Sequence, residues 1–346
     1  MALGAHTAAA NLEGIDLLHG WANDFDADAC ATYVSNIPGT TNDSVHCLDV
    51  RKLDIPSLAA IDGLAFGFPC NDFSSVGKSR GLDGEYGPLY RYGVSALDSH
   101  NPTWFVAENV SGLRSANAGS AFSQILTEMS QAGDYGYNLT PHLYSFDKYG
   151  VPQKRKRIII VGVRADLDQK FNVPSPRPFE EMDVSAAYAL TNPPMNGLLK
   201  NHELTRQSEK VVERLSHILP GQNAFTAALP KHLQLNVKGA KISQIYRRLR
   251  AEHPSYTVTG SGGGGTHVYH WDEPRALTNR ERARLQSFPD DYIFIGTKES
   301  VRKQIGMAVP AKGAEAVFTA LFKSLLGIPY ESISPNIRPV AASARR

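Results

Sequence analysis

The first 165 residues alternate short apolar runs with stretches of helical character. Apolar runs in such an alternation are typical of buried strands, so the pattern predicts a mostly parallel sheet with helices on both faces. Ligands of such sheets bind at the carboxyl ends of the strands, which makes polar residues just after the runs candidate site residues. The apolar runs are Ile15–Trp21, Ile61–Phe68, Thr103–Ala107 and Ile158–Val163.

Three helices carry recognisable end signals. Ala121–Ala132 is helical in pattern and is followed by a glycine, the residue most common just after a helix. Thr278, with Glu281 three residues later, forms a capping-box pattern that opens a second helix. Pro310 opens a third, which we expect to run to Gly327.

Between Asp166 and Asp272 the alternation dissolves into a proline-rich and basic stretch. Ten Lys/Arg and three Glu fall between Asn196 and Arg250. A run of four glycines, at Ser261–Thr266, adds a flexible turn. We interpret this stretch as a separate, loop-rich, basic module.

The net charge of +2 hides an asymmetry along the chain. Residues 1–147 carry 17 acidic and 6 basic residues, a net of −11, whereas residues 148–346 carry 17 acidic and 30 basic, a net of +13. Proteins that bind nucleic acid often concentrate positive charge in one part. A dipolar soluble protein is the alternative interpretation.

The three cysteines, Cys30, Cys47 and Cys70, are far apart in the sequence and include no CxxC pair. This spacing argues against a disulfide framework and against a zinc site, and it fits a reducing cytoplasm. No apolar run approaches the roughly 20 residues that a membrane span needs. The N-terminus shows no basic stretch followed by an apolar core, the pattern of a secretory signal.

Chemically reactive residue types follow the apolar runs. Cys70 lies on the loop after the second run, Glu108 directly follows the third, and Arg155 and Arg157 lead into the last. A reactive thiolate needs access and an electropositive setting, which such a crevice offers. Alternation along an extended chain puts both arginines on one face. Each residue has a simpler interpretation: a structural cysteine, a capping or solvent-facing acid, and a solvated basic face.

Five motifs, in order, resemble those of the cytosine-5 DNA methyltransferases of the bacterial restriction–modification type. The resemblance covers about residues 1–165 and 275–327. The motifs are Pro69-Cys70, followed by Asn71 where the family often has Gln, then Glu108-Asn109-Val110, Gln153-x-Arg155-x-Arg157, the segment from Arg275 to Pro289, and Gln304-Ile-Gly-Met-Ala-Val-Pro310.

The resemblance implies a covalent mechanism. Cys70 would attack carbon 6 of a flipped-out cytosine, which makes carbon 5 nucleophilic enough to accept a methyl group. Glu108 would protonate or hydrogen-bond nitrogen 3 of the ring. Arg157, with Arg155 beside it, would hold the base carbonyl and favour the Cys70 thiolate.

The methyl donor implied by the resemblance is S-adenosylmethionine. Asp24 would hold the ribose hydroxyls, Phe25 would stack on the adenine, and Asp49 would contact the adenine amino group. Strand-end turn chemistry is the alternative for both acids. The residues expected to contact the cofactor are Leu3, Gly4, Asp24, Phe25, Asp49, Val50, Pro69, Leu89, Met307 and Ala308.

The implied substrate is double-stranded DNA. The loop Ser75–Leu89 resembles the mobile loop that closes over the flipped base; an ordinary surface loop is the alternative. We expect a bacterial or phage-encoded cytoplasmic monomer without a metal or a membrane, whose partner in a restriction–modification system would be a cognate endonuclease encoded nearby. The residues expected to contact DNA are Ser74, Lys78, Arg80, Arg247, Arg248 and Arg250.

The expected fold is α/β. A Rossmann-like methyltransferase sheet is expected from residues 1–165 and 275–330, a smaller target-recognition domain from 166–274, and a loose tail from 331–346. The resemblance implies that the first strand of the family is truncated here, because Leu3-Gly4 falls on the second half of the Phe-x-Gly-x-Gly turn that follows that strand. We therefore expect the natural reading frame to start upstream, and the chain as it stands to bind S-adenosylmethionine weakly. Near the C-terminus, Met307-Ala308 replaces the usual Asn-Ser.

Two other functions stay open on the residues alone. One is an RNA cytosine-5 methyltransferase of the tRNA-methylating branch, although the Cys-Phe-Thr signature of that branch is not found. The other is a catalytically impaired, DNA-binding homologue, motivated by the truncated first strand.

Overall fold

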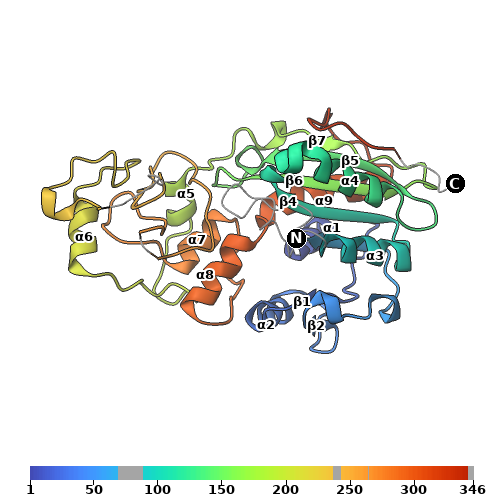
Figure 1. Cartoon of the computed structure of the whole chain (residues 1–346), viewed down its shortest axis with the longest axis horizontal. Helices are drawn as coiled ribbons and strands as arrows, with labels where there is room; N and C mark the ends of the chain where they lie inside the picture. The colour runs from blue at the N-terminus through green and yellow to red at the C-terminus, as the bar shows by residue number, and fades with distance from the viewer. Residues whose placement is uncertain (69–88, 237–242, 264, 342–346) are drawn as a thin grey trace. The chain divides into compact units, whose positions relative to one another are not determined.

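The structure is a computed structural model that describes residues 1–68, 89–236, 243–263 and 265–341, apart from the side chains of 115–118. The chain divides into two compact units (Figure 1). Unit 1 comprises Met1–Ser145, Lys156–Pro178 and Ala314–Arg346, and unit 2 comprises Phe146–Arg155 and Phe179–Gly313.

The centre of unit 1 is a four-stranded sheet in the order β3-β4-β6-β5. β3 (Gly63–Gly67) runs parallel to β4 (Trp104–Val110), but β6 (Lys156–Arg164) runs antiparallel to both β4 and β5 (Tyr137–Ser145). The prediction of a mostly parallel sheet was therefore wrong for the part of the sheet formed by β4, β6 and β5. Only ten residues separate β5 from β6, too few for the crossover that a parallel pair requires.

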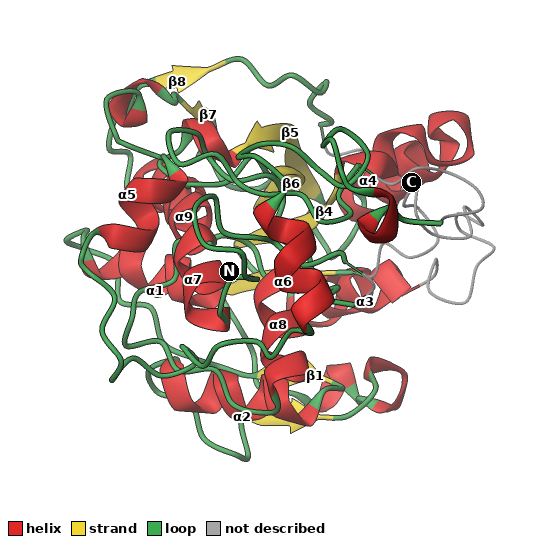
Figure 2. Ribbon diagram, turned by 90° about the vertical axis from the view of Figure 1, so that its left-hand side faces the viewer, coloured by secondary structure: helices red, strands yellow, loops and turns green. Residues whose placement is uncertain are grey.

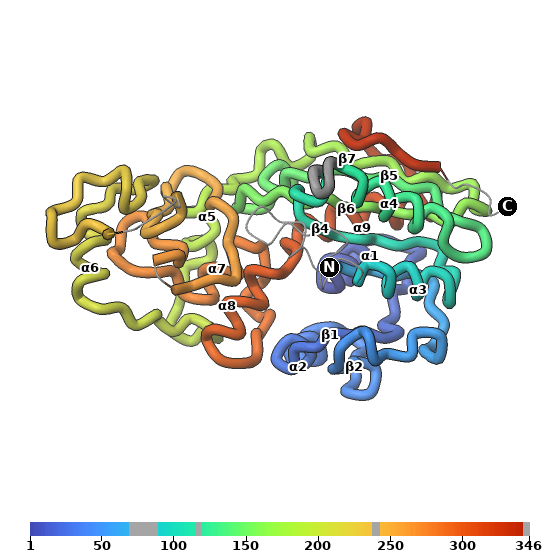
Figure 3. The backbone as a smooth tube through the Cα atoms, in the orientation of Figure 1, coloured from blue at the N-terminus to red at the C-terminus, as the bar shows by residue number. Residues whose placement is uncertain are grey.

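A second, two-stranded parallel sheet in unit 1 consists of β1 (Ala22–Asp24) and β2 (Val45–Cys47). Among the described residues it is not hydrogen-bonded strand to strand with the four-stranded sheet, and it stands apart from β4 in Figure 3. The predicted strand Ile15–Trp21 is irregular chain instead. At its C-terminal end, the Trp21 indole Nε1 donates a hydrogen bond of 3.1 Å to the carbonyl of Ala59.

The chain opens with helix α1 (Ala2–Ala10), where the sequence predicted the second half of a glycine turn at Leu3-Gly4. Both residues lie in its first helical turn, and the Leu3 carbonyl accepts a hydrogen bond from Thr7 Oγ1 at 2.9 Å. Burial lowers the pKa of the Met1 amino group to about 6, an effect that the charge of Glu108 opposes. The start of α1 therefore lies near the carboxyl end of β4.

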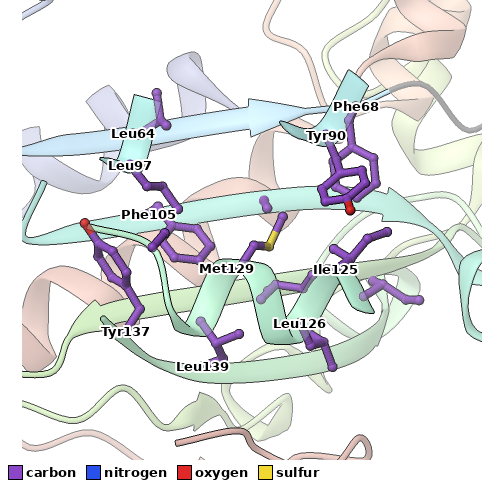
Figure 4. Close-up of a cluster of buried hydrophobic side chains, with 14 of the residues drawn as sticks. Leu64, Phe68, Tyr90, Leu97, Phe105, Ile125, Leu126, Met129, Tyr137 and Leu139 are labelled. Atoms are coloured by element: carbon purple, nitrogen blue, oxygen red, sulfur yellow. The ribbon is translucent and has the colours of Figure 1, made fainter. Parts of the chain in front are cut away.

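Helices cover both faces of the four-stranded sheet. α3 (Tyr90–His100) and α4 (Ser120–Ser130) pack on one face and form the large apolar core shown in Figure 4. The other face is covered by α9 (Ala311–Leu325), whose Phe318 and Phe322 rings meet Trp104 of β4 edge to face. The predicted helix over Ala121–Ala132 is confirmed as α4, and Gly133 follows it with a φ of 69°.

Smaller elements complete unit 1. α2 (Ala27–Asn36) packs on the β1–β2 pair, and β7 (Val173–Pro174) pairs with β8 (Ser332–Ile333). The tail was expected to be loose, yet its described part is attached to β5. Val340 pairs with Leu139, and Asn336 Nδ2 donates to the Leu143 carbonyl at 3.0 Å.

Unit 2 is rich in loops, drawn in green in Figure 2 between its short helices. The predicted capping box at Thr278 and Glu281 is confirmed at the start of α7. Buried arginines then fix the loops: the Arg280 guanidinium donates to the carbonyls of Lys200, Pro289 and Tyr292. The helices are α5 (Ala186–Thr191), α6 (Glu209–Ser216), α7 (Asn279–Leu285) and α8 (Lys298–Met307).

The unit boundaries differ from the domains predicted from sequence. Residues 275–313, expected to return to the catalytic domain, belong to unit 2, because α7 packs with α5 and its arginines bind the loops before α6. Only from Ala314 does the chain rejoin unit 1.

One segment, Lys298–Leu325, is long and apolar enough to be considered as a membrane span. Its most apolar stretch is 72% buried inside the structure, which is typical of core helices in soluble proteins.

Candidate active site

The register of β4 against β6 brings Glu108 and Arg157 together. Glu108 lies opposite Ile159 and Arg157 opposite Val110, so the two side chains are diagonal neighbours on one face of the sheet. Arg157 Nε lies 2.8 Å from Glu108 Oε1, and the side chains are only 15% and 14% exposed. Two motifs that are 49 residues apart in the sequence thus form one largely desolvated ion pair.

Asn109 ties the end of β3 to this pair. Its buried side chain donates from Nδ2 to the Phe68 carbonyl at 3.1 Å and accepts from the Val110 amide at 2.8 Å. Gly67 lies against the same carboxylate, since a Cβ there would be 3.4 Å from Glu108 Oε2. Asn109 was not among the predicted site residues, although its position next to Glu108 in the motif was a usable signal.

Five predicted site residues follow Phe68 in the stretch that the structure does not describe. They are Pro69, Cys70, Ser74, Lys78 and Arg80, and their assignments stay predictions.

Arg155 is not positioned like Arg157. It is 1% exposed, and its guanidinium donates to the carbonyls of Val258 at 3.0 Å and Gly306 at 2.9 Å, all within unit 2. The predicted catalytic role of Arg155 beside Arg157 stays a prediction. Because its N–H groups bind backbone carbonyls, Arg155 holds unit 2 together. The alternation itself is confirmed: Gln153 and Arg155 are buried and Lys154 is exposed.

Acidic side chains follow both strands of the β1–β2 sheet. Asp24 ends β1, and its Oδ1 accepts the Asp26 amide at 2.9 Å, while Asp26 caps the start of α2. Phe25 between them is 73% exposed, unusual for so large an apolar side chain. The Arg51 side chain, hydrogen-bonded to Asp49, lowers the pKa of that carboxyl to about 2. The predicted strand-end turn contacts are thus present at both acids.

The other predicted cofactor residues lie in different settings. Val50 opens a 3₁₀ turn after Asp49 and packs against the core of unit 1, and Leu89 precedes α3. Met307 and Ala308 belong to unit 2, at the C-terminal end of α8, where Met307 is 66% exposed. The structure tests none of these four as a cofactor contact.

The three arginines predicted to bind DNA differ in burial. Arg248 is 6% exposed and donates to the carbonyls of Leu215, Ile218 and His270 at 2.8–3.1 Å, and its predicted contact with phosphate stays a prediction. The Arg247 guanidinium lies over the Tyr256 ring at 4.8 Å, and Arg250 is exposed.

Acids after the parallel strands β1 and β2, and a largely desolvated carboxylate–arginine pair on β4 and β6, are typical of α/β enzymes whose ligands bind at the carboxyl ends of strands. The family described as C-5 cytosine-specific DNA methylases matches residues 2–323. The chain belongs to this family and is a DNA (cytosine-5-)-methyltransferase.

Several curated relatives are similar over most of the chain. The "Type II methyltransferase M.BbvI" of Brevibacillus brevis is 58% identical, covering 93% of this chain and 86% of the relative. The "Type II methyltransferase M.NgoFVII" of Neisseria gonorrhoeae is 42% identical, covering 89% and 80%.

Solved structures share the fold. A protein encoded within an E. coli prophage superposes with a TM-score of 0.69 at 22% identity, covering 94% of this chain and 96% of that one. The Dnmt2 methyltransferase of S. pombe gives a TM-score of 0.56 at 17% identity, covering 94% and 97%.

The Asn109 contact generates a stability prediction. Asn109→Ala leaves the buried Phe68 carbonyl without its donor, and we expect the free energy of unfolding to fall by about 1–3 kcal/mol. Urea denaturation measures this change. Asn11→Ala, which removes an exposed contact with Glu315 at 3.5 Å, is the matched control and should be near neutral. Equal stabilities for the wild type and Asn109→Ala would show that this bond does not hold the end of β3.

Proposed function

We propose that Glu108 and Arg157 form the cytosine-binding part of the active site, and that Cys70 is its nucleophile. The observation that carries the proposal is the ion pair of 2.8 Å at the carboxyl edge of β4. A carboxyl and a guanidinium side by side match the two adjacent polar edges of a cytosine, nitrogen 3 and the oxygen on carbon 2.

Each residue then has a separate task. The Cys70 thiolate adds to carbon 6, and electron density moves through the ring toward nitrogen 3 and the carbonyl oxygen. Glu108 supplies a proton or a strong hydrogen bond at nitrogen 3 as that charge develops. A base removes the proton from carbon 5 after methylation, and elimination releases Cys70.

Arg157 stabilises the same charge from the other side. A guanidinium has five N–H donors. The contacts with Glu108 and with the Lys156 carbonyl need only two of them, so the group can also donate to the base carbonyl. The pair is largely desolvated, which strengthens its electrostatic effect on the bound ring.

S-adenosylmethionine is the proposed methyl donor, and the residues of the β1–β2 edge fit it. Asp24 and Asp49 lie at or just after the ends of parallel strands, where carboxylates bind ribose hydroxyls and an amino group, and the exposed Phe25 ring offers a surface for the adenine. When bound, the cofactor supplies an electrophilic methyl group.

Unit 2 is proposed to bind double-stranded DNA. Exposed basic side chains spread over it, and relatives named as Type II methyltransferases support a role in restriction–modification. The exposed basic residues between 200 and 250 that the structure describes are Lys200, Arg206, Lys210, Lys231 and Arg250.

The nucleophile is tested with DNA that contains 5-fluorocytosine. Fluorine on carbon 5 blocks the final elimination, so the wild type should form an adduct that survives denaturation. Cys70→Ser should form none and should lose methyl transfer, while duplex binding remains. An adduct with Cys70→Ser, or normal turnover by it, would rule out Cys70 as the nucleophile. Denaturing gels and radiolabelled methyl transfer provide both readouts.

Salt dependence tests the DNA contacts of unit 2. Each phosphate contact adds about 0.9 to the slope of log affinity against log salt, so Arg250→Ala should lower the slope by about that amount. Arg338→Ala, an exposed change in the tail of unit 1, should leave it unchanged. An unchanged slope for Arg250→Ala would exclude its phosphate contact.

Arg248→Ala should instead cost at least ~2 kcal/mol of stability, because its guanidinium binds buried carbonyls.

A further inference from the structure

Two cysteines that are distant in the sequence meet at the β1–β2 edge. Cys30 is the fourth residue of α2, and Cys47 ends β2 (Figure 1). Cys47 is the register partner of Asp24, whose carbonyl accepts the Cys30 thiol at 3.4 Å. The Cys47 side chain is also near enough to raise the pKa of the Cys30 thiol. Both are free cysteines in the structure.

The two sulfurs differ in exposure. Cys30 is 6% exposed, whereas Cys47 is open to solvent. Burial, and then the neighbouring Cys47 side chain, raise the pKa of the Cys30 thiol to about 12. An oxidant in solution therefore meets Cys47 before Cys30. An accessible thiol beside a second, resolving thiol is the arrangement of redox-sensing pairs.

The pair lies between the acids assigned above to the cofactor. Cys47 precedes Asp49 by two residues and pairs in register with Asp24. We propose that Cys30 and Cys47 are a redox site: oxidation by a hydroperoxide joins them in a disulfide, and the disulfide weakens binding of S-adenosylmethionine. The second half of this proposal rests on the proposed function.

The chemistry balances in two steps. The Cys47 thiolate attacks the peroxide, the O–O bond breaks, and Cys47 becomes a sulfenic acid while the other oxygen leaves as water or an alcohol. The Cys30 sulfur then attacks the Cys47 sulfur. The S–S bond forms, and the hydroxyl leaves as water with the proton of Cys30. Dithiothreitol reverses the change by thiol–disulfide exchange.

We expect the disulfide to disturb the carboxyl end of the β1–β2 sheet, because Cys30 then has no thiol proton to donate. The hydrogen bond to the Asp24 carbonyl is then lost, and the first turn of α2, capped by Asp26, is drawn toward the end of β2. Phe25 lies between Asp24 and Asp26 and shifts with them. We expect the affinity for S-adenosylmethionine to fall about tenfold, which corresponds to ~1.4 kcal/mol.

The test uses the full chain, reduced or treated with limited hydrogen peroxide. Peptide mapping should show a Cys30–Cys47 cross-link, with a mass loss equal to two hydrogen atoms, that dithiothreitol reverses. Cys47→Ser and Cys30→Ser should each abolish the cross-link, and Cys70→Ser should retain it. Calorimetry with S-adenosylmethionine then compares the two forms, and Cys47→Ser should bind equally before and after peroxide.

The outcomes separate the two halves. Over-oxidation of Cys47 without a cross-link overturns the redox site. A cross-link with unchanged affinity overturns its effect on the cofactor. A reduced chain that binds no S-adenosylmethionine contradicts the cofactor assignment and with it the effect on binding, while the mapped cross-link still decides the redox site.

Discussion

The antiparallel register of β4 and β6 is the constraint on which the site depends. It sets Glu108 diagonally across from Arg157 on one face of the sheet. A shift of one residue would turn one of the two side chains to the opposite face, where α3 and α4 pack. The core fixes this register, since Phe105, Ala107, Ile158 and Ile160 are almost completely buried in one cluster. Apolar packing thereby determines where this largely desolvated ion pair forms.

Buried arginines in unit 2 show a different use of positive charge. Arg155, Arg248 and Arg280 each donate to two or more backbone carbonyls from separate segments of the chain. A unit with few regular hydrogen-bonded elements needs such donors, because buried carbonyls without partners are costly. The basic composition of this region therefore serves the fold as well as the proposed contact with DNA.

Much of this organisation can be predicted from the sequence. The apolar runs that became β3, β4 and β6 and the end signals of α4 and α7 are local, so they are visible in the sequence. β5 was missed because Asn138, Thr140 and Pro141 interrupt its apolar pattern. The motifs identified Glu108 and Arg157 but not their pairing, and they did not separate Arg157 from the buried Arg155. The contacts of a guanidinium, like the meeting of two cysteines, depend on segments that only the fold brings together.

Single-turnover methyl transfer by Glu108→Ala tests the proposed cytosine site most directly. A positioned proton donor typically contributes 10²–10⁴-fold, so we expect the rate to fall by about that factor while duplex affinity is retained. Glu128→Ala, which removes an acid of α4 that pairs with Arg91 on the surface, is the matched control and should turn over normally. A Glu108→Ala protein that methylates DNA at the wild-type rate would contradict the assignment of the Glu108–Arg157 pair to the cytosine ring.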